Sequence, residues 1–188
     1  MVLLAMPTLT FGAELFVSWH TNAFVPSSYG GKILPGLGST ITATANLIDK
    51  GKIVSLASRD VRWFLNRKLI NYGVGKTTVE FQRDPLSLND TSAQLKLFLN
   101  YNGENMERFV AIPFQKPEVV IHADAPNGII ASGSHTLRAL LYYWNIGQAR
   151  DVSMSWTVNG EPAGSEGDLS NVQLDLPRFR APTPLNLT

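Results

Sequence analysis

The chain has 188 residues, with 16 Lys and Arg against 15 Asp and Glu, and it contains no cysteine. The near-neutral charge argues against a dedicated nucleic-acid-binding protein, whose basic residues form a clustered surface. The lack of cysteine excludes disulfides, cysteine nucleophiles and thiolate zinc sites, and no apolar run is long enough to span a membrane.

The N-terminal segment is apolar or neutral from Val2 to Phe11, and a glycine and an alanine follow it. This pattern is typical of the hydrophobic region and cleavage site of a secretory signal peptide, here without a preceding Lys or Arg. Because strand-like alternation starts only at Leu15, we predict that residues 1–13 are the remainder of a signal peptide. The alternative is a buried first strand.

Alternating apolar and polar residues predict the strands of the first half. A strand at 15–20 precedes a loop at 24–38 that is rich in proline and glycine. The clearest alternation follows, with Ile41, Ala43, Ala45 and Leu47 on one face of a strand at 40–48. Further strands are predicted at 61–65, 77–81, 93–99 and 108–112, with Asn102–Gly103 as a hairpin turn.

The second half has fewer predicted strands. Residues 115–117 form the predicted linker, and strands follow at 119–121, 137–143, 152–158 and 172–176. The remaining residues, 177–188, contain three prolines and cannot form two central strands. We see no convincing helix.

Two strand-like segments repeat at one offset. Each pair below is separated by 93 positions: Val61 and Met154, Trp63 and Trp156, Leu65 and Val158, Asn66 and Asn159, Val79 and Val172, Phe81 and Leu174. One gapless offset predicts two copies of a β domain, at 14–115 and 116–188. The second copy lacks two strands that the first copy has after Val79, so it is incomplete at its C-terminal end.

Short strands with a tryptophan on a middle strand are typical of a sandwich of two sheets. We therefore predict an all-β fold of two tandem immunoglobulin-like Greek-key sandwiches, the second apparently incomplete. The predicted structural core comprises Trp63, Trp156, Val79 and Val172.

The residues that carry the tryptophan strands resemble tandem immunoglobulin-like domains of uncharacterised secreted bacterial surface proteins. The matching segments are 63–67, 156–160 and the loop 24–35. Some such proteins occur beside pilus or surface-assembly components, so the resemblance implies an extracellular structural or adhesive role.

One segment, Gly73 to Thr78, looks like the end of a phosphate-binding P-loop. The full pattern needs a glycine at the position of Ile70 and a helix after the loop, whereas a strand is predicted here. We therefore reject nucleotide binding.

The histidines and carboxylates form no recognisable site. None of the three histidines has a second ligand at metal-binding spacing; they are His20, His122 and His135. Calcium between Asp84 and Asp90, or between Asp124 and Asn127, stays an open alternative to plain turn residues. We predict no catalytic residue, no cofactor and no metal site.

Two groups of residues are candidates for partner binding. The first is Phe24, Tyr29 and Lys32 in the irregular loop, because loops on a rigid scaffold often carry recognition. The alternative is that its aromatic residues cap the end of a sandwich.

The second candidate group is Leu140, Tyr142 and Trp144, on the face of their strand opposite Leu137 and Leu141. A strand that is apolar on both faces is unusual in a two-layer sandwich. The patch is therefore covered, by the other domain, by a partner or by the missing strands.

These observations predict a non-enzymatic extracellular or cell-surface module, structural or adhesive, that acts through protein–protein contacts, with a periplasmic location as the alternative. Two other functions stay open: a pilus-type subunit completed by a donated strand, and a carbohydrate-binding accessory module. We expect a protein partner at the cell surface, with a glycan possible and no nucleic acid.

Overall fold

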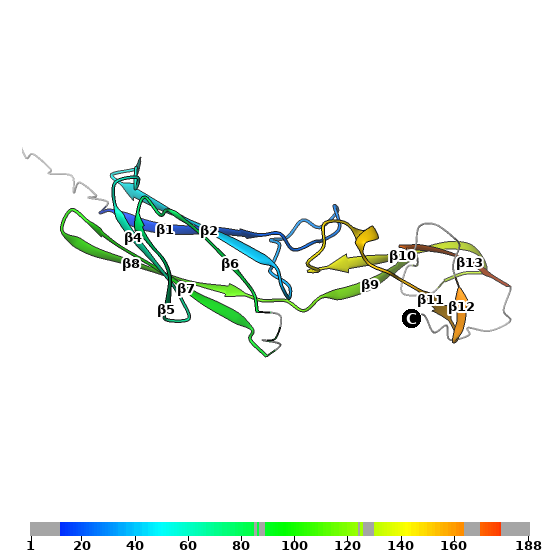
Figure 1. Cartoon of the computed structure of the whole chain (residues 1–188). Coiled ribbons are helices and arrows are strands. Elements are labelled where there is room, and N and C mark those ends of the chain that lie inside the picture. Colours follow the sequence, from blue (N-terminus) through cyan, green and yellow to red (C-terminus); the bar gives the residue numbers. More distant parts are fainter. Residues whose placement is uncertain are drawn as a thin grey trace, which may run out of the picture. The chain divides into compact units, whose positions relative to one another are not determined.

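The computed structural model describes residues 12–84, 86, 89–123, 125, 130–163 and 170–177. These residues form the strands β1 to β13 and one short 3-10 helix, η2 (Ala149–Asp151), so the prediction of an all-β chain is confirmed (Figure 1). Within these ranges, no helix is both long and apolar enough to cross a membrane.

The chain divides into two compact units, and the second is discontinuous in sequence. The first unit comprises Met1–Thr21 and Thr40–Phe114, and the second comprises Asn22–Ser39 and Gln115–Thr188. The division after Phe114 falls beside the predicted linker at 115–117. The repeat predicts the loop 22–39 as part of the first domain, whereas the structure groups it with the second half of the chain.

The first sheet of the first unit is built around one central strand. That strand is β2 (Thr40–Asp49), and its neighbours are β1 (Glu14–Thr21), β3 (Lys52–Val54) and β6 (Thr78–Gln82). All pairings are antiparallel, and Ala43 lies opposite both Trp19 and Val79. The predicted alternation in β2 is confirmed, because Ile41, Ala43, Ala45 and Leu47 are all buried.

The second sheet of the first unit has four antiparallel strands. Their order is β5 (Lys68–Val74), β4 (Asp60–Leu65), β7 (Ser92–Tyr101) and β8 (Glu104–Pro113). The predicted hairpin turn joins β7 to β8, and both Asn102 (φ 54°) and Gly103 (φ 86°) adopt positive φ. Positive φ at both central residues matches the twist of the flanking strands.

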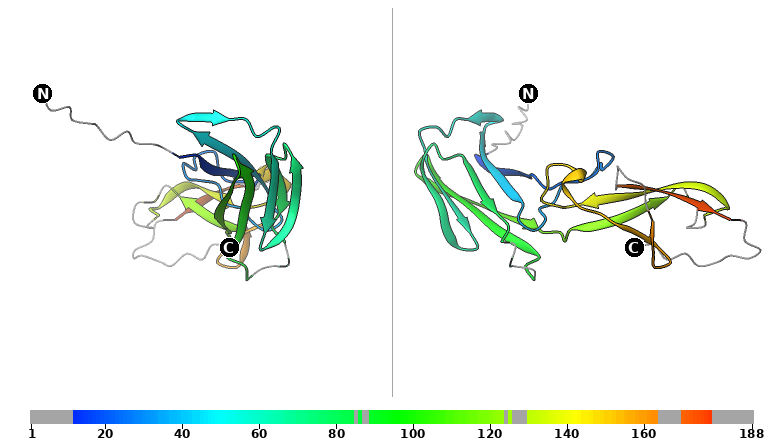
Figure 2. Two further views of the ribbon diagram at one scale, coloured as in Figure 1. Left: turned by 90° about the vertical axis from the view of Figure 1, so that its left-hand side faces the viewer. Right: turned by 45° about the vertical axis from the view of Figure 1, so that its right-hand side comes forward.

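The two sheets of the first unit face each other across a shared core (Figure 2). Trp63 belongs to this core and is fully buried. Its strand, β4, has a neighbour on each side, β5 and β7. The indole Nε1 of Trp63 donates a hydrogen bond to the carbonyl oxygen of Lys76 at 2.8 Å. The indole therefore buries a large apolar area without leaving its N–H unsatisfied.

The second unit has a smaller framework. A sheet of three antiparallel strands has the order β13 (Asn171–Leu176), β10 (Gly133–Tyr142) and β9 (Glu118–Ala123), and a hairpin pairs β11 (Trp156–Val158) with β12 (Glu161–Ala163). Its core cluster contains Leu137, Ala139, Trp156 and Val172. The strand expected at 152–158 begins only at Trp156.

Corresponding strands of the two units pair in the same way. In the first unit Val79 of β6 lies opposite Ala43 of the central strand, and in the second Val172 of β13 lies opposite Leu137. The tryptophan strands differ, because β4 is paired with β5 and β7, whereas among the described residues β11 is paired only with β12. Residues 1–11 and 178–188, which include most of the predicted signal segment and nearly all of the tail, lie outside the described residues.

Candidate binding surface

The loop 22–39 is attached to the first unit at its ends and packs within the second unit. The loop begins after the last residue of β1, Thr21, and ends before the first residue of β2, Thr40. The Thr21 hydroxyl donates a hydrogen bond to the carbonyl oxygen of Thr40 at 2.9 Å. A turn in the loop is closed by a 2.9 Å hydrogen bond from the Tyr29 amide to the carbonyl of Pro26. Gly36 lies so close to the Tyr143 carbonyl that any Cβ would collide with it.

A short antiparallel bridge joins the loop to the chain just after β10. The Phe24 amide donates to the Trp144 carbonyl at 2.6 Å, and the Tyr143 amide donates to the Phe24 carbonyl at 2.8 Å. Phe24 and Trp144 were predicted separately as candidates from distant parts of the sequence. The bridge brings them together in one unit.

Three tyrosines form a cluster beside this bridge, which we call the tyrosine cluster: Tyr29, Tyr142 and Tyr143. Their ring centres lie 5.9 to 6.2 Å apart, and Tyr29 meets the other two edge to face. The hydroxyls of Tyr29 and Tyr143 are 2.9 Å apart. The Tyr29 hydroxyl also lies 3.3 Å from the carbonyl of Lys32, which it can reach as a donor.

Tyr143 has an unusual backbone and a perturbed hydroxyl. Its φ is 62°, a left-handed conformation that is uncommon for a bulky residue. The hydrogen bond with Tyr29, followed by burial, raises the pKa of Tyr143 from 10.0 to about 12. The predicted strand 137–143 ends one residue too late, because Tyr143 turns out of β10 after Tyr142, and it begins four residues after the observed start at Gly133.

A cleft of about 420 Å³ opens next to the bridge, within the second unit. Apolar side chains and two asparagines line it, and the lining residues are Asn22, Ala23, Phe24, Val25, Ile33, Asn145, Ile146 and Gly147. The Asn145 side-chain amide donates to the carbonyl of Gly38 at 2.9 Å, which ties this wall to the loop. The Asp151 carboxylate accepts from the Gly147 and Gln148 amides at 3.1 and 2.9 Å and shapes the turn.

The two predicted binding groups thus meet at one surface. Phe24, Tyr29, Tyr142 and Trp144 are half-buried there, and Lys32 is exposed. Phe24 bridges to Trp144 and the Tyr29 ring contacts Tyr142, so the loop covers part of the apolar patch. Leu140 is also half-buried and lies opposite Val120 on β9.

Sequence reasoning missed Tyr143 and the cleft residues Asn22, Ile33, Asn145 and Ile146. One signal was present, because three consecutive aromatic residues at 142–144 cannot all lie on one face of a strand. Such a run indicates that the alternation of buried and exposed residues in the strand ends there. No local sequence pattern indicates that this run pairs with the loop 22–39.

The other motifs have local structural roles. Gly75 lies in the turn between β5 and β6, so a strand follows the P-loop-like segment. The Asp84 carboxylate accepts from the Leu86 amide at 2.8 Å, and His135 Nε2 lies 2.8 Å from the Ala131 carbonyl. In the described ranges, no group of three or more His, Asp or Glu is arranged to hold a metal ion. Asp124 and Asn127 lie outside those ranges.

Comparison of the sequence with protein-family models and with curated proteins finds no match.

Proposed function

We propose that the chain is a non-enzymatic extracellular module of two immunoglobulin-like units, structural or adhesive, that binds a protein partner. The observation that carries the proposal is the surface where the loop 22–39 meets the end of β10. It combines Tyr, Trp and Phe rings with asparagine, serine and glycine in a loop, beside a cleft. This is the composition that recognition loops on immunoglobulin scaffolds use.

The immunoglobulin-like part of the proposal is supported by the paired arrangement of strands. The repeat of the sequence is matched by equivalent pairings of β2 with β6 and of β10 with β13. Secretion is supported by the apolar run from Val2 to Phe11. Recognition by loops on such a scaffold needs no catalytic group.

Site-directed photo-cross-linking tests the proposal. A photoreactive amino acid replaces exposed Lys32 in the loop, and a matched probe replaces exposed Lys50 in the β2–β3 turn of the first unit. After incubation with a cell-envelope fraction of the source organism, we expect one discrete protein adduct from position 32 and none from position 50. Equal labelling from both positions, or none from position 32, contradicts the proposal.

A further inference from the structure

The outward face of the sheet β5-β4-β7-β8 carries an aromatic surface that the sequence analysis did not single out. Inward positions of these strands fill the core, so the alternate positions lie on the opposite face. The strand register aligns them in two rows across the sheet. The first row contains Tyr72, Arg62 and Phe98, and the second contains Phe64, Lys96 and Phe109.

Both rows have the same order, with a cation between two rings. The Arg62 guanidinium lies 5.8 Å from the ring centre of Phe98, and Lys96 Nζ lies 5.6 and 5.3 Å from the ring centres of Phe64 and Phe109. In each row the two rings are two strand spacings apart, about 10 Å. Tyr72 is 67% exposed and Phe109 60% exposed, so one ring in each row is open to a ligand.

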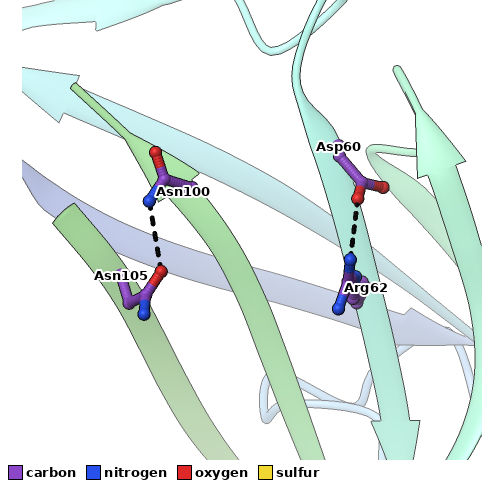
Figure 3. A network of polar contacts seen from close by, with 4 residues as sticks. All are labelled: Asp60, Arg62, Asn100 and Asn105. Atoms are coloured by element: carbon purple, nitrogen blue, oxygen red, sulfur yellow. Dashed lines mark hydrogen bonds and ion pairs between the residues drawn. The ribbon is translucent and has the colours of Figure 1, made fainter. Parts of the chain in front are cut away.

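The charges on this face cancel. Arg62 pairs with Asp60 at 3.2 Å, and Lys96 pairs with Glu107 at 2.6 Å (Figure 3 shows the Asp60–Arg62 pair). A nucleic acid would need cations that are free to replace its counterions. The centre of a protein interface is normally depleted of charged residues. A neutral polar ligand therefore fits this face better than a nucleic acid or a protein partner does.

Amide groups add to the polar character. The Asn100 side-chain amide donates to the side-chain oxygen Oδ1 of Asn105 at 3.1 Å, between β7 and β8 on the same face (Figure 3). Charge-paired side chains and amides can exchange hydrogen bonds with hydroxyl groups, and aromatic rings can stack on the C–H faces of sugars. A sheet surface of this kind therefore offers both contacts that a carbohydrate uses.

We propose that this face binds a neutral glycan with an extended β-1,4-linked backbone. The chain lies along a row, stacks on the two rings and places hydroxyls beside the cation between them. The ring separation of about 10 Å, which is two strand spacings, is close to the length of two sugars in such a backbone. This site belongs to the first unit and is independent of the partner surface proposed for the second.

Calorimetric titration of the full chain with cellohexaose and chitohexaose tests the proposal. We expect saturable binding of at least one of them that does not change with salt. Tyr72→Ala weakens binding along the first row and Phe109→Ala weakens binding along the second, each by about tenfold, as loss of an exposed aromatic contact does. Phe109→Trp, which keeps a ring, retains binding, and so does the matched control Phe16→Ala on β1 of the other sheet.

Four results would overturn the proposal. The first is that neither oligosaccharide binds. The second is that an oligosaccharide binds but neither alanine variant weakens its binding. A third is salt-dependent binding of oligothymidine that the same variants abolish, which would assign the face to single-stranded nucleic acid. The fourth is a concentration-dependent dimer that Phe109→Ala dissociates, which would assign it to a protein interface. An unchanged thermal midpoint shows that each variant is folded.

Discussion

At the scale of single residues, Tyr143 combines a left-handed backbone with a hydrogen-bonded hydroxyl. Its left-handed backbone is held by the bridge to Phe24, and its hydroxyl is held by Tyr29. A strained residue persists only where its surroundings over-determine its conformation. The tyrosine cluster and the bridge supply those constraints from two segments.

We expect Tyr29→Phe to lower the pKa of Tyr143 from about 12 toward 10.0, because the largest cause of the rise is the hydrogen bond to Tyr29. A raised folded-state pKa means that this hydroxyl stabilises the fold fully below pH 10, and that the contribution is lost as pH rises toward 12. Ultraviolet titration of tyrosinate measures it, with Tyr143→Phe to assign the signal. An unchanged titration in Tyr29→Phe argues against this hydrogen bond.

Trp63 gives a second prediction at this scale. We expect Trp63→Phe to destabilise the first unit by about 1–3 kcal/mol, because it leaves the Lys76 carbonyl without its indole donor and removes buried ring area. Denaturant unfolding measures the loss. Tyr72→Phe on the exposed face is the control and should change stability by less than about 0.5 kcal/mol. Equal stability of Trp63→Phe and the wild type would contradict the prediction.

At the scale of elements, the β7–β8 hairpin depends on its turn. Gly103 has a φ of 86°, which costs a residue with a Cβ about 1–2 kcal/mol. We therefore expect Gly103→Ala to lower the free energy of unfolding by that amount. Gly30→Ala is the control, because a Cβ there meets nothing and its φ is not left-handed. The two variants are compared by chemical denaturation, and equal effects would contradict the turn assignment.

The same scale explains what the sequence could predict. The strands at 41–47 and 93–99 alternate strictly because one face of each fills a core, and both were found. β5 was missed because it carries an extra residue, Ile70, opposite the Trp63–Phe64 step of β4, and this bulge interrupts the alternation of β5. The aromatic rows were missed as well, because they exist only once the register of four strands is known.

For the surface around the tyrosine cluster, the sequence predicted the segments involved but not the contact between them. Both segments were singled out from their aromatic residues, but their meeting was not foreseen. The hydroxyls of Tyr29 and Tyr143 belong to residues 114 positions apart, and no local pattern encodes such a pairing. The repeat also led to the wrong domain for the loop 22–39, because it assigned the loop to the first copy.

At the scale of the whole molecule, the two units have separate cores. We expect Trp63→Ala and Trp156→Ala each to destabilise only its own unit, by about 3–5 kcal/mol at a fully packed site. Calorimetry should then show two transitions, with a different one lowered in each variant. A single transition that both variants shift equally would show that the units unfold together.

The discontinuity of the second unit also has a consequence for how the protein is made. The ribosome synthesises the loop 22–39 long before the segment that it packs against, because Tyr29 and Tyr143 are 114 positions apart. At about 5–20 residues per second, the loop waits on the order of 6 to 23 seconds for its counterpart. During that interval its aromatic side chains lack their native neighbours, so the order of synthesis exposes this segment to chaperones before the fold can cover it.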